Sequence, residues 1–438
     1  MNRVVITGMG IWSCLGKTLD EVRDSLYEGR SGIVFDPERK EIGFRSALTG
    51  KVEVPDLKKE LSRSQRVFMP QQAKFAYCAT RDALRDAGVD EEYLASNEVG
   101  LLYGNDSSAL PVIESVDIIR EKKDTMMCGS GAIFQSMNST VTMNLDCIFR
   151  LKGMNLTVSG ACASGSHAIG LGALLIQHGL QEMVVCGGAQ EVHPYAVASF
   201  DGISAFSVRE NEPEKASRPF DRDRDGLVPS GGAATVILES YESAVRRGAR
   251  IYGEVLGYGF SGNGDHISTP NVDGPRRSLE MAVKQAGIDR NIIGYINAHA
   301  TSTHVGDANE AKAIASVFGD RTVPVTSTKS QTGHEMWMAG ASEVIYSMLM
   351  MKNDFIAANL NFENPDEDSA RLLIPAERMS RHFDVFLSNS FGFGGTNSTL
   401  IIKNLYYAGH QRDSACQGPL LGSGSDQDGL ARKLHQVL

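Results

Sequence analysis

The chain has 438 residues, enough for two or three domains with a large core. Apolar residues make up 42% of the sequence and charged residues 22%, which is typical of a soluble globular enzyme. The net charge of −10 argues against general binding of nucleic acid or of anionic membranes. A local basic patch for an acidic partner is still compatible with this charge.

The seven cysteines are odd in number and show no paired metal-ligand spacing; they stand at positions 14, 78, 128, 147, 162, 186 and 416. The apolar run at residues 4–6 is too short for a secretory signal, and no run approaches the ~20 apolar residues needed to span a bilayer. We therefore expect reduced thiols, a cytoplasmic location and no membrane insertion.

Strand-like and helical segments alternate along the first half of the chain. Residues 4–7 predict a short buried strand that ends in a glycine-rich turn, and the alanine-rich residues 71–87 predict a helix closed by Gly88. An apolar helix is expected at residues 167–176. Further strands are expected at residues 99–103, 154–158, 182–186 and 233–238.

The second half continues this alternation, which predicts an α/β architecture with mostly parallel internal sheets. No internal duplication is visible from periodicity. Residues 417–426 are rich in glycine and serine, which is typical of a flexible stretch, so we expect a disordered tail over residues 406–438. The expected strands are 251–257, 293–297, 323–326, 385–388 and 398–403, and the expected helices are 278–286, 307–318 and 340–351.

Cys162 is surrounded by residues with almost no side chain, in the segment SGACASGS at residues 159–166. It stands where the strand at residues 154–158 gives way to a helix. A cysteine at a helix N-terminus meets free N–H groups and the positive end of the helix dipole, which favour the thiolate. The pattern indicates a cysteine that a substrate can reach.

Two histidines and a glycine loop stand far downstream in similar surroundings. His299 lies in NAHATST (297–303), His334 lies in STKSQTGH (327–334), and SNSFGFGGTN follows at 388–397. A single buried cysteine or histidine is more often structural than catalytic. Because all of them stand among small and hydroxyl residues, we read them together as a site for thioester chemistry, with glycine N–H groups available to an anion.

These four segments, in this order and spacing, resemble the β-ketoacyl-acyl-carrier-protein synthases of the thiolase superfamily, of the elongating class I/II type. The resemblance extends from RVVITGMG at residues 3–10 to about Lys403 and includes EKASRPFD (214–221) and RDG (224–226). It implies two similar α/β halves in five layers, αβαβα. Residues 1–250 would carry the nucleophilic cysteine and residues 251–405 both histidines, while the tail departs from the family.

The resemblance also implies a reaction, the decarboxylative condensation of a malonyl thioester with an acyl group held on Cys162. His299 and His334 would donate hydrogen bonds to the enolate oxygen. The backbone N–H groups of Cys162 and Phe393 would form the oxyanion hole. Gly392 and Gly394, with Gly395, would let the loop move so that Phe393 gates access to the cysteine.

Supporting roles follow from the same resemblance. Lys329 would tie the histidine loop through Glu310 and raise the local positive potential. Asp307 and Glu310 lie one helical turn apart and could share a face, although a solvated helix face is an open alternative. Ala300 stands where the family usually has glycine, which a negative φ would tolerate.

Substrate contacts are implied as well. Thr301 and Thr303 match hydroxyls that bind the pantetheine arm. An apolar acyl tunnel would run from Cys162 toward a homodimer interface, past residues 105–111, with Phe134 and residues 137–138 close behind. Small side chains at Ser107 and Ser108 predict an unplugged floor that admits medium to long chains.

The implied partner is acyl carrier protein, which carries the substrates on its phosphopantetheine, and no cofactor, metal or nucleic acid is expected. His299 and His304 lack a third ligand for zinc. We read His167 as a packing residue and assign no site to His193, His266 or His382. Basic residues that stand out as docking candidates are Arg63, Arg66, Arg120, Lys122 and Lys123.

Other functions fit less well. A thiolase would need a second cysteine in the glycine loop, and residues 390–396 contain none. A class III synthase uses asparagine where His334 stands, and a non-catalytic chain-length-factor subunit would lack the active cysteine. A ketosynthase of a polyketide or aryl-polyene pathway, with the same chemistry, is left open by the sequence.

Overall fold

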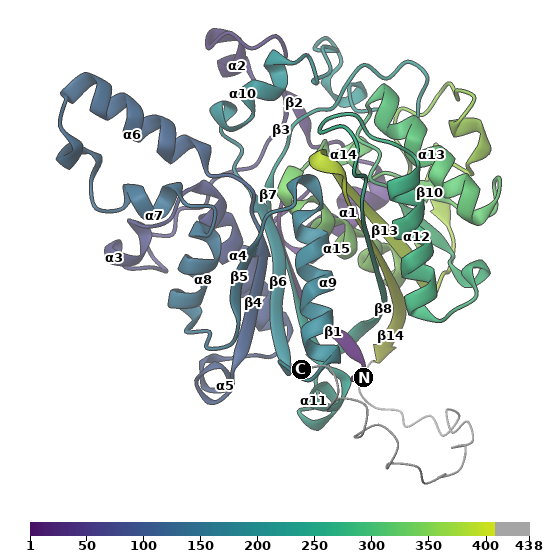
Figure 1. The fold of residues 1–438 in the computed structure, drawn as a ribbon, viewed down its shortest axis with the longest axis horizontal. Helices are drawn as coiled ribbons and strands as arrows, with labels where there is room; N and C mark the ends of the chain where they lie inside the picture. Colours follow the sequence, from purple (N-terminus) through teal and green to yellow (C-terminus); the bar gives the residue numbers. More distant parts are fainter. Residues whose placement is uncertain (408–438) are drawn as a thin grey trace, which may run out of the picture. The chain divides into compact units, whose positions relative to one another are not determined.

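The computed structural model describes residues 1–407, so the tail from residue 408, including Cys416, lies outside the described residues. Ten strands join in the order β10-β9-β13-β14-β8-β1-β7-β6-β4-β5 (Figure 1). The first half supplies β1 (Val4–Trp12), β4 (Val99–Gly104), β5 (Asn155–Val158), β6 (Met183–Gln190) and β7 (Gly232–Ser240). The second supplies β8 (Ile251–Gly262), β9 (Tyr295–Asn297), β10 (Val325–Thr326), β13 (Val385–Gly392) and β14 (Thr396–Tyr407).

The two halves have the same topology. Read from the outer edge inward, the first half is ordered β5-β4-β6-β7-β1 and the second β10-β9-β13-β14-β8. In each half the outer two pairings are parallel and the inner two antiparallel. This repeat confirms the two similar α/β halves. The expectation of mostly parallel sheets is wrong, because the last strand of each half runs antiparallel between its two neighbours.

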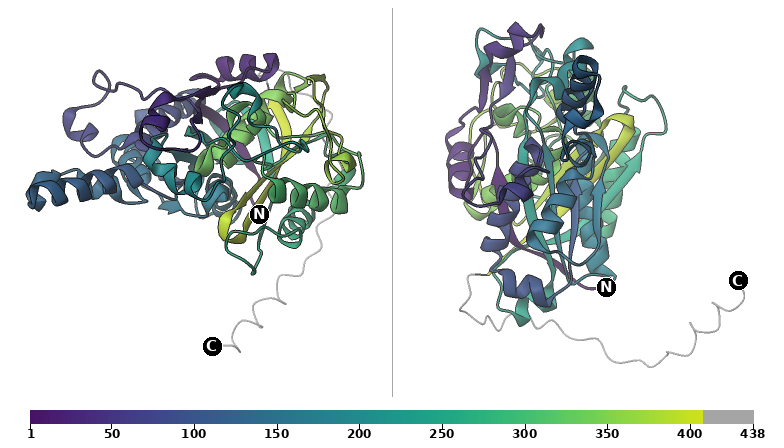
Figure 2. Two further views of the ribbon diagram at one scale, coloured as in Figure 1. Left: turned by 90° about the horizontal axis from the view of Figure 1, so that it is seen from above. Right: turned by 90° about the vertical axis from the view of Figure 1, so that its left-hand side faces the viewer.

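Helices form three layers around these sheets (Figures 1 and 2). Helices α9 (Ser164–Gln177) and α15 (Ala339–Lys352) lie in the middle and contact strands of both halves. Helices α4 (Gln71–Asp86) and α8 (Thr140–Phe149) cover the first sheet, and α12 (Asp273–Ala286), with α13 (His304–Phe318) against it, covers the second. Because α15 packs on both sides, it is buried from Ala339 to Met351 and not on one face only.

Strand β1 is longer than the sequence predicts. We expected it to end in a turn at Gly8, but it continues through Gly8 and Gly10 to Trp12. The glycines lie against helix α4: a Cβ added at Gly10 would lie 2.0 Å from the carbonyl oxygen of Ala79, and one at Gly8 would lie 2.3 Å from that of Ala83. These glycines therefore let a helix backbone approach the strand closely, which is their role in place of a turn.

Smaller elements complete the fold, and α6 extends away from the sheets with α7 beside it (Figures 1 and 2). In residues 1–407, no helix is long and apolar enough to cross a bilayer. The remaining helices are α1 (Leu19–Glu28), α2 (Pro37–Glu41), α3 (Arg63–Arg66), α5 (Glu91–Ser96), α6 (Ala109–Lys122), α7 (Ala132–Ser136), α10 (Pro194–Gly202), α11 (Tyr241–Arg246) and α14 (Lys329–Thr332). The remaining strands are β2 (Ile33–Phe35), β3 (Leu48–Gly50), β11 (Phe355–Ile356) and β12 (Met379–Ser380).

The close contact at Gly10 predicts a large effect of a single methyl group. Gly10→Ala should lower the free energy of unfolding by about 1–3 kcal/mol, because the new Cβ meets the rigid backbone of α4. Urea denaturation followed by circular dichroism measures this. Gly202→Ala is the matched control, since no atom lies within 4 Å of its added Cβ. Equal stability of Gly10→Ala and the wild type would contradict the packing argument.

Candidate active site

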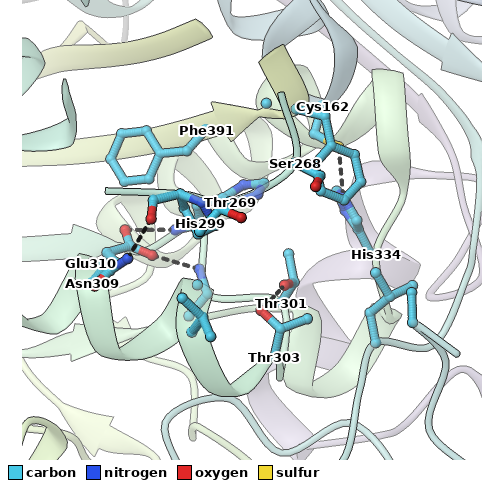
Figure 3. A pocket seen from close by; sticks show the side chains of 18 of the residues that line it. Cys162, Ser268, Thr269, His299, Thr301, Thr303, Asn309, Glu310, His334 and Phe391 are labelled. Atoms are coloured by element: carbon cyan, nitrogen blue, oxygen red, sulfur yellow. Dashed lines mark hydrogen bonds between the residues drawn. The ribbon is translucent and has the colours of Figure 1, made fainter. Parts of the chain in front are cut away.

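The structure brings the segments singled out in the sequence together around one cavity of about 350 Å³ (Figure 3). Cys162, His299, His334 and Phe393 all line it, together with Thr301 and Thr303. These residues come from both halves of the fold.

Cys162 lies at the junction of strand and helix that the sequence predicts. It sits in a short 3₁₀ turn (Ala161–Ala163) that runs directly into α9. The turn is strained, because Ala161 has φ +46°. The carboxylate of Asp106 holds this turn by accepting a hydrogen bond from the Ala161 N–H at 3.0 Å, and Ser164 Oγ binds the Gly160 N–H at 2.9 Å.

Burial dominates the electrostatics of the cysteine. Cys162 is only 4% exposed, and desolvation raises the pKa of its thiol to about 12, although the charge of Lys329 acts in the opposite direction. The backbone N–H of Cys162 favours the thiolate, as expected for this position, but burial outweighs it. His334 Nε2 lies 3.0 Å from Cys162 Sγ, so a neutral imidazole stands where it can accept the thiol proton.

The two histidines form a neutral pair. Their rings lie 5.3 Å apart, edge to face. Burial lowers the pKa of both His299 and His334 well below the usual value, and the charge of Lys329 lowers both further. Neutral imidazoles can each donate one N–H to an oxygen in the cavity, which is the task that the sequence analysis gives them.

Helix α13 holds the loop that carries the first histidine. Glu310 accepts hydrogen bonds from the backbone N–H groups of His299 at 2.9 Å and Ala300 at 2.7 Å, and Asn389 Nδ2 binds the same carboxylate at 2.9 Å. Burial raises the pKa of Glu310 to about 7. Ala300 has no positive φ, so alanine fits this position without strain.

The second carboxylate of α13 holds the rest of the loop. Asp307 accepts hydrogen bonds from the N–H groups of Phe220 at 2.8 Å and Thr303 at 3.3 Å. Asp307 and Glu310 are both fully buried and face the same side, so the alternative of a solvated helix face is excluded. The hydroxyls of Thr301 and Thr303 lie 3.1 Å apart at the cavity wall.

Lys329 has a different partner from the one expected. Its ammonium forms a fully buried ion pair with Glu343 of α15. The expected tie to Glu310 is wrong, because the oxygens of that carboxylate already bind backbone N–H groups and Asn389. The lysine nevertheless supplies the positive potential that was expected, since its charge lowers the pKa values of both histidines and of Cys162.

The glycine loop faces the cysteine between β13 and β14. The backbone N–H groups of Cys162 and Phe393 both act on Cys162 Sγ and lower the pKa of the thiol, against the larger effect of burial. These two donors are the pair expected for an oxyanion hole. Gly394 has φ +78°, and its N–H donates to the carbonyl of Ile267 at 2.7 Å. The Phe393 ring stacks on Phe200 with centroids 5.9 Å apart and is 42% exposed. A gating movement of this loop stays a prediction.

Ser108 is not brought to the cavity. It is buried, accepts a hydrogen bond from Gln72 Nε2 at 2.9 Å and donates to the carbonyl of Gln135. Beside it, the indole N–H of Trp337 donates to Ser107 Oγ at 3.2 Å. The expectation of an open floor at Ser107 and Ser108 is therefore wrong in this structure, because a tryptophan packs there.

Sequence reasoning missed two further supports. Arg224, in the motif at residues 224–226, donates to the carbonyls of Thr303 at 3.0 Å and His304 at 2.8 Å and thereby fixes the end of the histidine loop. His167 does more than pack. It bridges Tyr258 Oη at 2.6 Å and Thr396 Oγ1 at 2.7 Å, which ties α9 to the glycine loop. Only the motif of Arg224 gave a signal in the sequence.

Within residues 1–407, no group of three or more His, Cys, Asp or Glu side chains is arranged to hold a metal ion. The five basic docking candidates lie on α3 and at the end of α6, away from the residues that line the cavity.

Comparison with known proteins agrees with this geometry. The β-ketoacyl synthase N-terminal domain matches residues 1–244 and the C-terminal domain matches residues 252–363. The 3-oxoacyl-[acyl-carrier-protein] synthase 1 of Haemophilus influenzae is 41% identical over 406 residues, which cover 92% of this chain and 99% of that protein.

Solved structures agree as well. A β-ketoacyl synthase from Burkholderia phymatum has a TM-score of 0.88 at 36% identity and covers 92% of this chain and 100% of its own. A type II polyketide ketosynthase, solved in complex with its acyl-carrier protein, has a TM-score of 0.84 at 28% identity, with coverage of 92% and 99%. The fold is thus the thiolase-like fold of the ketosynthases, and the chain belongs to the β-ketoacyl synthase family.

Proposed function

We propose that this chain elongates a fatty acyl chain by two carbons, through decarboxylative condensation of malonyl-acyl-carrier protein with an acyl group held on Cys162. The observation that carries the proposal is the placement of Cys162 Sγ 3.0 Å from His334 Nε2, beside His299 and the N–H of Phe393. The named relative, a 3-oxoacyl-[acyl-carrier-protein] synthase, supports both the reaction and the carrier.

The first half-reaction loads the cysteine. The thiol of Cys162 passes its proton to His334, and the sulfur attacks the carbonyl carbon of the acyl thioester. The tetrahedral oxyanion accepts hydrogen bonds from the N–H groups of Cys162 and Phe393. The C–S bond to the pantetheine then breaks, and that sulfur leaves as a thiol with the proton from His334. Because Cys162 and His334 are both neutral at rest, no buried thiolate forms until the substrate is present.

The second half-reaction forms the carbon–carbon bond. The malonyl group loses carbon dioxide, and the resulting enolate oxygen accepts hydrogen bonds from His299 and His334. The carbanion attacks the acyl carbonyl on Cys162, and the C–S bond breaks to release the 3-oxoacyl thioester and the Cys162 thiolate. The thiolate then takes up a proton from solvent, which restores the neutral thiol. The hydroxyls of Thr301 and Thr303 line the cavity, where they suit the amides of a pantetheine arm. We propose that no metal or organic cofactor takes part.

A ketosynthase of a polyketide pathway is the second candidate, since a polyketide enzyme shares the fold at 28% identity. The higher identity of 41% to the 3-oxoacyl-[acyl-carrier-protein] synthase favours fatty acyl elongation. The complete set of Cys162 and two histidines speaks against a non-catalytic subunit.

The six cysteines that the structure describes are all free, which supports a reducing cytoplasmic location.

Substitutions at the three central residues test the reaction. Cys162→Ala should abolish condensation, whereas Cys162→Gln, which mimics the acylated cysteine, should retain malonyl decarboxylation. His299→Ala and His334→Ala should each lower decarboxylation by ~10²–10³ or more, because each removes a donor to the enolate oxygen. Release of carbon dioxide and formation of product measure the two activities. Condensation by Cys162→Ala, or wild-type decarboxylation in either histidine variant, would contradict the assignment.

The carrier protein is proposed to dock on the exposed basic residues. Acyl carrier proteins are acidic, and this chain is acidic overall, so a local basic surface must supply the attraction. A ketosynthase of similar fold has been solved with its carrier bound, which supports such docking.

Lys122 and Lys123, at the end of α6, provide the test. Lys122→Glu with Lys123→Glu should raise KM for carrier-linked substrates without lowering kcat, and the effect should weaken as salt screens the charges. A pantetheine substrate without carrier protein is the control, because its KM should not change. Unchanged kinetics with carrier protein at low salt would refute this docking surface.

A homodimer is proposed from the apolar surface around α6 and α7. Strand β5 is an edge strand, and Leu156 on it is 53% exposed. In the segments that follow α6, Met126 is 85%, Ile133 57% and Phe134 43% exposed. An edge strand and exposed apolar side chains both suit pairing with a second copy. Sedimentation velocity should give a dimer, and Leu156→Lys should weaken it; a monomeric wild type would contradict the proposal.

A further inference from the structure

Cys162 has an apolar side as well as a polar one. It belongs to a buried apolar cluster with Phe206, Leu227, Met336 and Trp337. The cavity extends from the cysteine along residues 266–271 and 303–306, where hydroxyl, imidazole and amide groups stand among apolar side chains, and Leu227 and Met336 of the cluster form part of its wall. Trp337 is absent from the residues that line this cavity.

The two sides suit the two ends of an acyl thioester, an argument that rests on the proposed function. A pantetheine arm carries amides and hydroxyls, so it fits the part of the cavity that Thr301 and Thr303 line. The alkyl chain on Cys162 Sγ must then extend toward the apolar cluster. Each methylene of the acyl chain strengthens binding about fourfold only if it enters apolar space. A close-packed interior offers such space only when a side chain moves away.

Trp337 occupies that apolar side. It lies in the 3₁₀ turn Met336–Met338 and is 8% exposed. Its indole N–H donates to Ser107 Oγ at 3.2 Å. Ser107 stands in the loop between β4 and α6, the segment past which the acyl tunnel is expected to run.

The main chain of Trp337 is fixed, so only its side chain can yield. A Cβ added at Gly188 would lie 2.5 Å from the Trp337 carbonyl oxygen, and one added at Gly165 would lie 3.0 Å from it, which shows how closely two elements pack on this turn. The neighbouring Met336 has φ +48°, a conformation that tight packing must maintain.

We propose that Trp337 is a specificity-determining residue that closes the acyl side of Cys162 and restricts the enzyme to short acyl groups. The hydrogen bond to Ser107 holds the indole in the closed position. Short groups stay in the space beside Cys162 that the cavity already offers, whereas longer chains require the ring to leave its place.

Loading of Cys162 by acyl-carrier-protein thioesters, measured by intact-protein mass spectrometry, tests the proposal. In the wild type, acetyl and butyryl groups should load about tenfold or more faster than octanoyl and dodecanoyl groups. Trp337→Ala should raise octanoyl loading about tenfold or more and leave butyryl loading within about twofold. Trp12→Phe is the matched control, because it changes the only other tryptophan in the sequence. The indole N–H of Trp12 donates to the Glu53 carbonyl, so this substitution should leave the selectivity unchanged.

Two further variants keep the test decisive if Trp337→Ala does not fold. Ser107→Ala removes the hydrogen-bond partner and Trp337→Phe shortens the ring, so each should raise octanoyl loading by a smaller factor. The Trp12→Phe protein retains Trp337 as its single tryptophan, and its fluorescence should change when butyryl loads on Cys162.

The outcomes separate this proposal from the one it rests on. If no thioester loads Cys162 in the wild type, the proposed function fails. If octanoyl and dodecanoyl load as readily as butyryl in the wild type, or if the selectivity survives in Trp337→Ala and in both milder variants, the condensing function stands and the role of Trp337 is overturned.

Discussion

Burial of Cys162, His299 and His334 around a single cavity is the constraint on which the rest of this structure depends. A buried charge is costly, so desolvation keeps the thiol protonated and both imidazoles neutral. The site must therefore create charge only when a substrate is bound, and its hydrogen-bond donors must already be in position. Preorganised donors of this kind stabilise charge that develops in a transition state without reorganising.

The polar groups behind the cavity serve that preorganisation. Both Glu310 and Asp307 accept hydrogen bonds from backbone N–H groups, so they fix the histidine loop and do not act as bases. Lys329 forms its ion pair with Glu343, while burial raises the pKa of nearby Glu335 to about 7. One lysine therefore stands among several buried carboxyl groups, and the positive potential at the histidines depends on how many of these are protonated.

The repeated topology explains why residues so distant in sequence meet. Strands β4 and β5 of the first half correspond to β9 and β10 of the second. Asp106 and Cys162 follow the first pair, and His299 and His334 follow the second. Equivalent loops, after the carboxyl ends of parallel strands, thus face one another across the two halves, a place where α/β folds commonly build sites. The glycine loop follows β13, which is parallel to β9, so it lies at the same edge of the sheet and completes the site.

Much of this could be predicted from the sequence, and the failures have physical reasons. The strand before Cys162 and the loops of both histidines were predicted because short motifs and strand signals are local. Gly8 and Gly10 were misread as a turn, since only the packing of α4 shows that they make room for a helix. The partner of Lys329 and the position of Trp337 depend on contacts between distant segments. The high pKa of the Cys162 thiol could not be predicted, because burial is a property of the whole fold.

The pH dependence of Cys162 alkylation tests the central claim most directly. Peptide mass spectrometry after short exposure to iodoacetamide gives the rate at Cys162, with the exposed Cys147 in the same sample as internal reference. Because burial raises the pKa of Cys162 to about 12, its thiolate forms only at alkaline pH. The rate at Cys162 should therefore be low at neutral pH and rise steadily through the alkaline range. A fast rate that is already constant at neutral pH would show a resting thiolate and contradict the neutral cysteine–histidine pair.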